Sequence, residues 1–289
     1  MKVQQKNTLI TNKIRQFPVT FGSHGVKLDG KVLLPVNAVT ERPVPAVVVC
    51  HGFGSSHRAV ETSARILAKK GIAGIIFDFR GHGTSGGAMD GKMAEDVTDA
   101  WNVMKQVPGV DKSRMGIIGH SLGAMSAIMG AAMVDLPRIL VALACPPIID
   151  REMIANATAG FGHWGHKNNS IIEFPRHGTF PWIKGIAGFL SRIYMYISGY
   201  HVRIDLQSFI KAVLRMNMAD VVNKLDSCAK LFVFCDGDTI TPYDKSVFVF
   251  EAACEPKQKI LAKGHHGTPI CRGELRSQWI NWVADKLLS

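Results

Sequence analysis

The stretch GHSLG at residues 119–123 decides the fold of this chain. It lies where an apolar, strand-like run ends and a run with helical periodicity begins. A serine at such a turn needs strained backbone angles, and the strand and the helix approach each other closely there, so small residues are needed on both sides. Gly119 and Gly123 supply them, each two residues from the serine. The stretch therefore predicts a nucleophile elbow, with Ser121 as the nucleophile.

Strand-like runs alternate with helical periodicity on both sides of this turn. The predicted strands are VPAVVVC (44–50), GIIFDF (74–79), RMGIIG (114–119), ILVALAC (139–145), KLFVFC (230–235) and KQKILAK (257–263), and the predicted helices cover 60–70, 94–107 and 273–288. The apolar cores of the strands are nearly continuous, as in strands buried on both faces. This pattern predicts a mostly parallel sheet with helices on both faces, preceded by an antiparallel edge over residues 16–36.

One long stretch, residues 146–225, interrupts the alternation. It separates two predicted strands that an ordinary crossover would join in roughly a dozen residues or more. It holds three of the four tyrosines, and apolar residues recur at helical spacing over 183–197. We expect an inserted helical cap here, with 1–145 and 226–289 as the two parts of one core. Packing on the core is favoured for the apolar face of this cap over a lid that contacts substrate or a membrane surface.

Five further segments complete a known pattern. They are KLDGKVLLP (27–35), HGFGSS (51–56), FDFRGHGTSGG (77–87), CDGDTITP (235–242) and KGHHGTP (263–269). Together with GHSLG they resemble the α/β-hydrolase family, over nearly the whole chain outside the insertion. The first also looks like the leading hairpin of the esterase and serine-aminopeptidase-like branches. The resemblance implies an α/β-hydrolase fold, with a sheet of the eight-stranded type and an inserted cap.

A candidate acid follows the predicted strand 230–235. A serine hydroxyl is a poor nucleophile unless an imidazole takes its proton, and a carboxylate must hold that imidazole. Asp238 lies in a turn that ends at Pro242, which is where the family's acid lies. Asp236 is the runner-up. We therefore expect Asp238 to be the carboxylate of a catalytic triad.

Two adjacent histidines, His265 and His266, follow the last predicted strand and are both candidates for the base. Only one of them can face the serine. The Gly-His ending common in the family favours His265, whereas the following Gly267 and the loop length favour His266, which we prefer. The chain order of serine, acid and base is the order of α/β-hydrolases, and other serine hydrolase folds use different orders.

Two backbone N–H groups are candidates for an oxyanion hole. A tetrahedral intermediate carries negative charge on the former carbonyl oxygen, and two preorganised donors are needed to stabilise it. Leu122 follows the nucleophile, and Phe53 lies in the HGFG segment after the first parallel strand. In the segment 77–87, Asp78 and Arg80 are interpreted as scaffold residues that hold loops together, and His82 is not expected to be catalytic.

These residues predict a serine hydrolase that cleaves a carboxylic ester of a small molecule through an acyl-enzyme. A thioesterase, an acyltransferase and a serine peptidase would use the same triad, and a non-catalytic ligand-binding protein is the alternative from another class. The glycine-rich stretches lack the residues of a phosphate loop or a dinucleotide site, so we expect no cofactor. His163 and His166 have no acidic or cysteine partner at ligand spacing, so we expect no metal.

The composition limits partners and compartment. Lysine and arginine exceed aspartate and glutamate by 34 − 23 = 11, but the excess is spread along the chain, so nucleic-acid binding is not expected. The N-terminal residues lack the apolar stretch of a signal peptide, and no apolar run is long enough to span a bilayer. The six cysteines include no CxxC pair and are interpreted as reduced thiols. These features predict a cytoplasmic enzyme.

Overall fold

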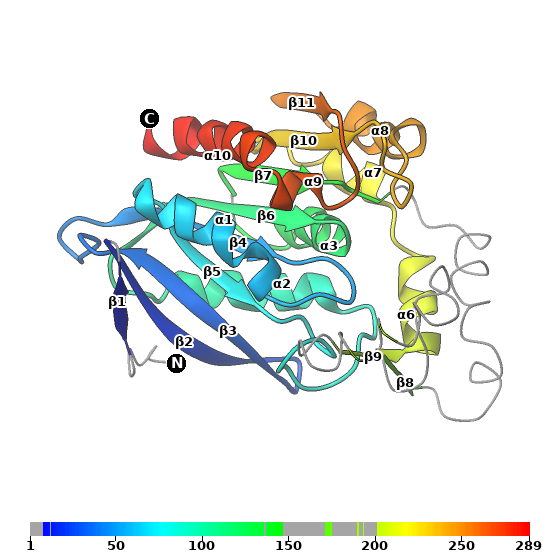
Figure 1. The fold of residues 1–289 in the computed structure, drawn as a ribbon, viewed down its shortest axis with the longest axis horizontal. Helices are drawn as coiled ribbons and strands as arrows, with labels where there is room; N and C mark the ends of the chain where they lie inside the picture. The colour runs from blue at the N-terminus through cyan, green and yellow to red at the C-terminus, as the bar shows by residue number, and fades with distance from the viewer. Residues whose placement is uncertain are drawn as a thin grey trace.

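The computed structural model of the chain describes residues 8–11, 13–135, 137–146, 171–174, 190, 193 and 201–289. Within them, a nine-stranded sheet forms the centre of the molecule, in the order β1-β2-β3-β5-β4-β6-β7-β10-β11 (Figure 1). The strands are β1 (Leu9–Thr11), β2 (Ile14–Ser23), β3 (Val26–Pro35), β4 (Val44–Cys50), β5 (Ala73–Phe77), β6 (Val110–His120), β7 (Ile139–Leu143), β10 (Ala229–Cys235) and β11 (Lys257–Ala262).

The sheet is parallel except at its N-terminal edge. β1 pairs antiparallel with β2, β2 with β3, and β3 with β5. From β5 to β11 every pairing is parallel. The predicted mostly parallel sheet with an antiparallel edge is confirmed. The short strand β1 adds a ninth strand that the sequence pattern did not predict.

Helices cover both faces of the sheet, and two buried apolar clusters lie beneath them (Figure 1). One cluster joins the sheet to α1 (Arg58–Lys69) and α10 (Gly273–Leu288), and the other joins it to α2 (Met93–Met104) and α3 (Leu122–Ala131). Along β4, Val48 belongs to the second cluster, whereas Val47 and Val49 belong to the first. This alternation is the two-residue period of a strand that is buried on both faces.

The insertion is described only in part. Its described elements are β8 (Ile171–Phe174), β9 (Val202–Asp205), α6 (Leu206–Val213) and α7 (Met218–Val222). β8 and β9 form a small antiparallel sheet, which the expectation of a helical cap did not include. Nearly all of the helix expected over 183–197 lies outside the described residues, and the division into core and cap stays a prediction.

Strand β9 ties the returning chain to the core. The N–H of Arg203 donates to the carbonyl of Gly81 at 2.7 Å, and the N–H of Met89 donates to the carbonyl of Arg203 at 2.8 Å. β9 is thereby hydrogen-bonded to two parts of the loop after β5. The loop that we interpreted as scaffold is thus the place where β9 joins the rest of the structure.

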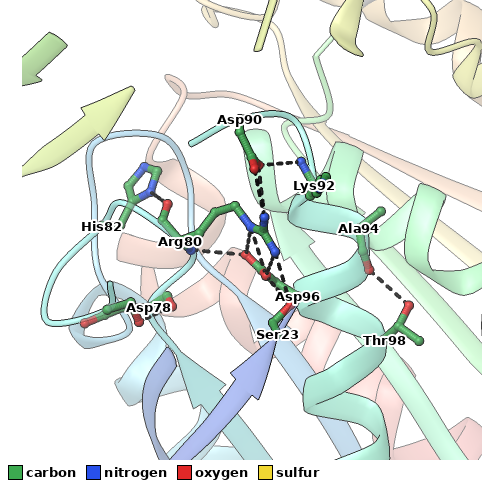
Figure 2. A network of polar contacts seen from close by, with 10 residues as sticks. Ser23, Asp78, Arg80, His82, Asp90, Lys92, Ala94, Asp96 and Thr98 are labelled. Atoms are coloured by element: carbon green, nitrogen blue, oxygen red, sulfur yellow. Dashed lines mark hydrogen bonds and ion pairs between the residues drawn. The ribbon is translucent and has the colours of Figure 1, made fainter. Parts of the chain in front are cut away.

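A buried ion-pair network anchors this loop to β2 and α2 (Figure 2). The guanidinium of Arg80 is 1% exposed and lies 2.7 Å from Asp96 of α2 and 3.0 Å from Asp90. It also donates to the hydroxyl of Ser23 at the end of β2. Burial opposes the charge on Arg80, but the bonds to Asp96 and Asp90 outweigh it and raise the pKa. Removal of one partner would leave a buried charge uncompensated, so the network restrains strand, helix and loop together.

Helix α3 approaches the sheet through two glycines of the elbow. A methyl group on Gly123 would meet the carbonyl oxygens of Cys50 and His51, and one on Gly119 would meet the backbone of Gly123. No neighbouring side chain can move to make this room, because the obstructing atoms are backbone. Both positions therefore require glycine, as the sequence pattern indicated.

We expect Gly123→Ala to lower the free energy of unfolding by about 1–3 kcal/mol, because overpacking in a close-packed site forces the backbone apart. Gly273→Ala is the matched control, since a methyl group at Gly273 has no neighbour within 4 Å. Urea denaturation followed by circular dichroism measures both changes. Equal midpoints for the two variants would contradict the close approach of α3 to β4.

Candidate active site

Four loops meet where parallel strands end. The residues at issue follow β4, β6, β10 and β11, and the carboxyl ends of parallel strands lie at one edge of the sheet. Ser121 lies between β6 and α3 and is 8% exposed. Its φ of 56° and ψ of −121° are unusual for a residue with a side chain, and such angles cost roughly 1–3 kcal/mol. Its N–H donates to the carbonyl of Leu143, and its carbonyl accepts from Ala124, so the turn is fixed on both sides.

Asp238 and His266 form a hydrogen-bonded pair. Nδ1 of His266 lies 2.9 Å from Oδ2 of Asp238. The carboxylate also accepts from the N–H groups of Ile240 and Thr241, and from the Thr241 hydroxyl at 2.6 Å. Burial alone would raise the pKa of Asp238, but the bonds from His266 and Thr241 outweigh it and hold that pKa below its ordinary value. The carboxylate is therefore charged and directs the other ring nitrogen of His266, Nε2, away from itself.

The two runner-up residues have other partners. His265 is exposed, and its Nδ1 lies 3.1 Å from the carbonyl of Gly237. Asp236 accepts from the N–H of Gly264 at 3.1 Å. The structure thus brings together Asp238 and His266, and it uses Asp236 and His265 to join the loops after β10 and β11.

His120, the residue before Ser121, links the elbow to the Asp238–His266 pair. Nε2 of His120 lies 2.8 Å from the carbonyl oxygen of His266, and the two rings are 5.0 Å apart. Among the residues that the structure describes, no hydrogen bond joins the Ser121 hydroxyl to His266 directly. Such bonds are often long in a substrate-free site and tighten when substrate binds.

The loop after β4 lies against the elbow. A Cβ on Gly52 would be 3.3 Å from Cβ of Ser121, so the backbone of this loop lies close to Ser121. The carbonyl of Gly52 lies 2.8 Å from Nδ1 of His51 and accepts from the N–H of Ser55. In a trans peptide the C=O and N–H groups point in opposite directions. Hence the N–H of Phe53 is turned away from the imidazole that holds the Gly52 carbonyl.

Leu122 offers the second candidate donor. It is the first residue of α3, and the N–H groups of a first helical turn have no acceptor within their own helix. It directly follows the strained Ser121, so its N–H lies on the same turn as the Ser121 hydroxyl. The expectation of an oxyanion hole at Phe53 and Leu122 agrees with this backbone arrangement and stays a prediction.

Three buried histidines surround these groups. Nε2 of His51 accepts from the N–H of Phe79 at 3.1 Å, so its proton lies on Nδ1. Burial lowers the pKa of His51, lowers that of His82 to about 3, and together with the neighbouring His266 lowers that of His120 to about 4. No role was predicted from the sequence for His51 and His120. Their only signal was their position beside Gly52 and Ser121 in the motifs HGFG and GHSLG.

The described residues show neither a metal site nor a membrane-spanning helix. They contain no group of three or more histidine, cysteine or acidic side chains arranged to hold a metal, and His163 and His166 lie outside them. No described helix is long and apolar enough to cross a membrane. The six cysteines are free, and Cys50, Cys145, Cys228 and Cys235 are buried.

A mostly parallel sheet of this strand order, with a strained serine after β6 and an Asp–His pair beyond β10 and β11, defines the α/β-hydrolase class of protein. The chain belongs to the α/β-hydrolase superfamily. Residues 41–167 match the family model described as serine aminopeptidase, S33.

Particular relatives extend this assignment. A thiohydrolase of Eupenicillium brefeldianum is 26% identical over 85% of this chain and 86% of its own length. An uncharacterized 31.7 kDa protein of Escherichia coli is 32% identical over 75% and 80%. Thiohydrolase aneE of Aspergillus aculeatus is 35% identical over 47% of this chain, and the matched segment covers 43% of the length of that relative. The crystal structure of the α/β hydrolase GrgF from Penicillium has a TM-score of 0.71 at 20% identity, covers 95% and 99% of the two chains, and shows the shared fold.

We expect His51 and His120 to be neutral at pH 7 with opposite tautomers, Nδ1–H in His51 and Nε2–H in His120, because each donates to a backbone carbonyl. His120 should stay neutral until the pH falls to about 4, since burial lowers its pKa. Long-range ¹H–¹⁵N correlation spectra measure both tautomers, and His51→Asn and His120→Gln assign the signals. A charged His120 at pH 6 would contradict the geometry.

Proposed function

We propose that the protein is a serine hydrolase that cleaves a carboxylic ester of a small molecule, with Ser121 as nucleophile, His266 as base and Asp238 as acid. The observation that carries the proposal is the 2.9 Å bond between Asp238 and His266, two groups from different loops that meet at the strand ends where the strained Ser121 lies. A buried, charged carboxylate bonded to an imidazole is the arrangement that orients a general base.

The proton transfers follow from the tautomer of His266. Its Nδ1–H donates to Asp238, so Nε2 carries the lone pair and accepts the proton of the Ser121 hydroxyl during attack. The imidazolium is stabilised by the Asp238 carboxylate and returns its proton to the leaving group. Water then attacks the acyl-enzyme by the same route in reverse, releasing the acid and regenerating Ser121.

The N–H groups of Leu122 and Phe53 are assigned as the donors that stabilise the negative charge developing on the carbonyl oxygen. The Leu122 N–H has no acceptor within its own helix, and the Gly52–Phe53 peptide is oriented by the bond between His51 and the Gly52 carbonyl. Donors fixed before the reaction cost no reorganisation when the charge appears. In this proposal His51 orients one oxyanion donor without touching the substrate.

Thioester hydrolysis is the second candidate. It is favoured by the names of the relatives, since the proteins of Eupenicillium brefeldianum and Aspergillus aculeatus are both thiohydrolases. The triad attacks the carbonyl carbon in either case, and only the leaving group differs. Acyl transfer and peptide cleavage use the same machinery. A small-molecule acyl substrate, the lack of nucleic-acid binding and a cytoplasmic location remain predictions.

We expect Ser121→Ala to abolish labelling by a fluorophosphonate probe, because the probe reacts with an activated serine. His266→Ala should lower kcat/KM by roughly a thousandfold or more, the scale of loss of a triad member. His265→Ala is the matched control and should stay near the wild-type value, since His265 contacts a backbone carbonyl and not the acid. Mass spectrometry locates the label and steady-state kinetics gives the rates. A larger loss of kcat/KM for His265→Ala than for His266→Ala would show that His265 is the base.

The leaving group is tested with one acyl chain presented both as an alkyl ester and as an N-acetylcysteamine thioester. Each kcat/KM is divided by the rate constant for hydroxide-catalysed hydrolysis of the same substrate, which corrects for the intrinsic reactivity of the bond. A thioesterase should give a normalised ratio of thioester to ester above one, because its site also binds the thiol-bearing group in the transition state. A ratio below one would favour the ester hydrolase, and Ser121→Ala sets the background for both substrates.

A further inference from the structure

The proposed base lies on the outermost strand of the sheet, far from the nucleophile in strand order. β11 is the edge strand, and β7 and β10 separate it from β6, which ends at His120. Three strand spacings amount to about 14 Å. The loop after β11 must therefore cross the ends of β10 and β7 before an imidazole on it can approach Ser121. A loop that crosses this span needs an anchor at its far end.

His120 supplies a contact at that end. It is 6% exposed, and its Nε2 lies 2.8 Å from the carbonyl oxygen of His266. A carbonyl only accepts, so Nε2 carries the proton and donates. The side chain of His266 is held by Asp238, which itself lies beyond β10, and its Nδ1 also lies 3.3 Å from the Thr241 hydroxyl. The bond from His120 thus joins the backbone of the base to the end of β6, the strand that leads to Ser121.

The same ring also contacts the loop after β4. A Cβ on Gly52 would be 3.1 Å from Nδ1 of His120, so the imidazole lies close to the backbone that precedes Phe53. The titratable groups that act on this ring are His266, Asp238 and His51. One buried side chain therefore contacts the base loop and the candidate oxyanion loop while it adjoins the nucleophile in the chain.

We propose that His120 is a positioning residue, which holds the backbone of His266 over the nucleophile elbow through its Nε2–H and sets the distance between the base and Ser121. The inference rests on the proposed function of Ser121 and His266. His120 neither touches substrate nor transfers a proton in this scheme. Its effect is exerted through the His266 carbonyl alone, so any neutral donor that reaches this oxygen should serve.

The test compares His120→Gln with His120→Asn. Both side chains are neutral amides, but only the glutamine places an N–H near the position of Nε2, whereas asparagine reaches about as far as Nδ1. We expect His120→Gln to retain kcat within about threefold and His120→Asn to lower it roughly 10- to 100-fold, the size expected for loss of one hydrogen bond to a catalytic loop. The KM of both should change little. His24→Asn, in the turn between β2 and β3, is the control for a histidine change remote from the site.

Two readouts separate positioning from mere loss of folded protein. The Nδ1 proton of His266, bonded to Asp238, should give a downfield ¹H signal that is absent in His266→Ala. This signal and the acidic limb of the kcat/KM profile should shift in His120→Asn and be restored in His120→Gln, with thermal unfolding as the check that both are folded. A variant that only reduces the folded fraction would lower the rate in proportion. The position of the His266 signal and the pH dependence of kcat/KM would then stay unchanged.

The outcomes distinguish the inference from the function on which it rests. Wild-type kinetics and an unshifted signal in folded His120→Asn would overturn the role of His120 while fluorophosphonate labelling of Ser121 still upheld the hydrolase. Equal losses in His120→Gln and His120→Asn would also overturn it, because the donor would then not be the property that matters. Failure of wild-type protein to label at Ser121 would overturn the proposed function, and the signal of His266 would still test its position.

Discussion

The close approach of helix α3 to strands β4 and β6 is the constraint on which the site depends. It exists because Gly119 and Gly123 lack side chains where backbone atoms of Cys50, His51 and Gly123 itself fill the space. This approach holds Ser121 at a φ of 56°, an angle that an unsupported serine would leave. It also brings the first turn of α3 beside the loop after β4, so nucleophile and candidate donors share one rigid corner of the fold.

The opposite side of the site is assembled across greater distances. Asp238 and His266 come from loops at the edge of the sheet, and their mutual bond orients the ring but does not connect it to the elbow. The connection runs through backbone carbonyls, since His51 holds that of Gly52 and His120 holds that of His266. Backbone contacts of this kind fix the position of a whole loop. The central strands therefore determine where the side chains at the tip of that loop lie.

The sequence allowed the sheet and its helices to be predicted, because strand and helix periodicity are local properties. The resemblance to the α/β-hydrolase family then indicated Asp238 as the carboxylate and two neighbouring histidines as its possible partners. The choice between His265 and His266 remained open, since it depends on which ring the loop turns toward Asp238. The contacts of His51 and His120 were beyond sequence reasoning for a related reason. Each joins residues distant in the chain, such as 120 and 266, and no local pattern marks a histidine that donates to a remote carbonyl.

Burial of the surrounding histidines has an electrostatic consequence for the proposed chemistry. His51, His82 and His120 all have pKa values below the ordinary range because they are desolvated, so they remain neutral while His266 alternates between imidazole and imidazolium. A second positive ring 5.0 Å from His266 would oppose that alternation in a medium of low dielectric constant. Because the neighbours stay uncharged, the attraction of the Asp238 carboxylate for the imidazolium is not offset. The same imidazoles can therefore act as hydrogen-bond donors beside the base without competing with it for a proton.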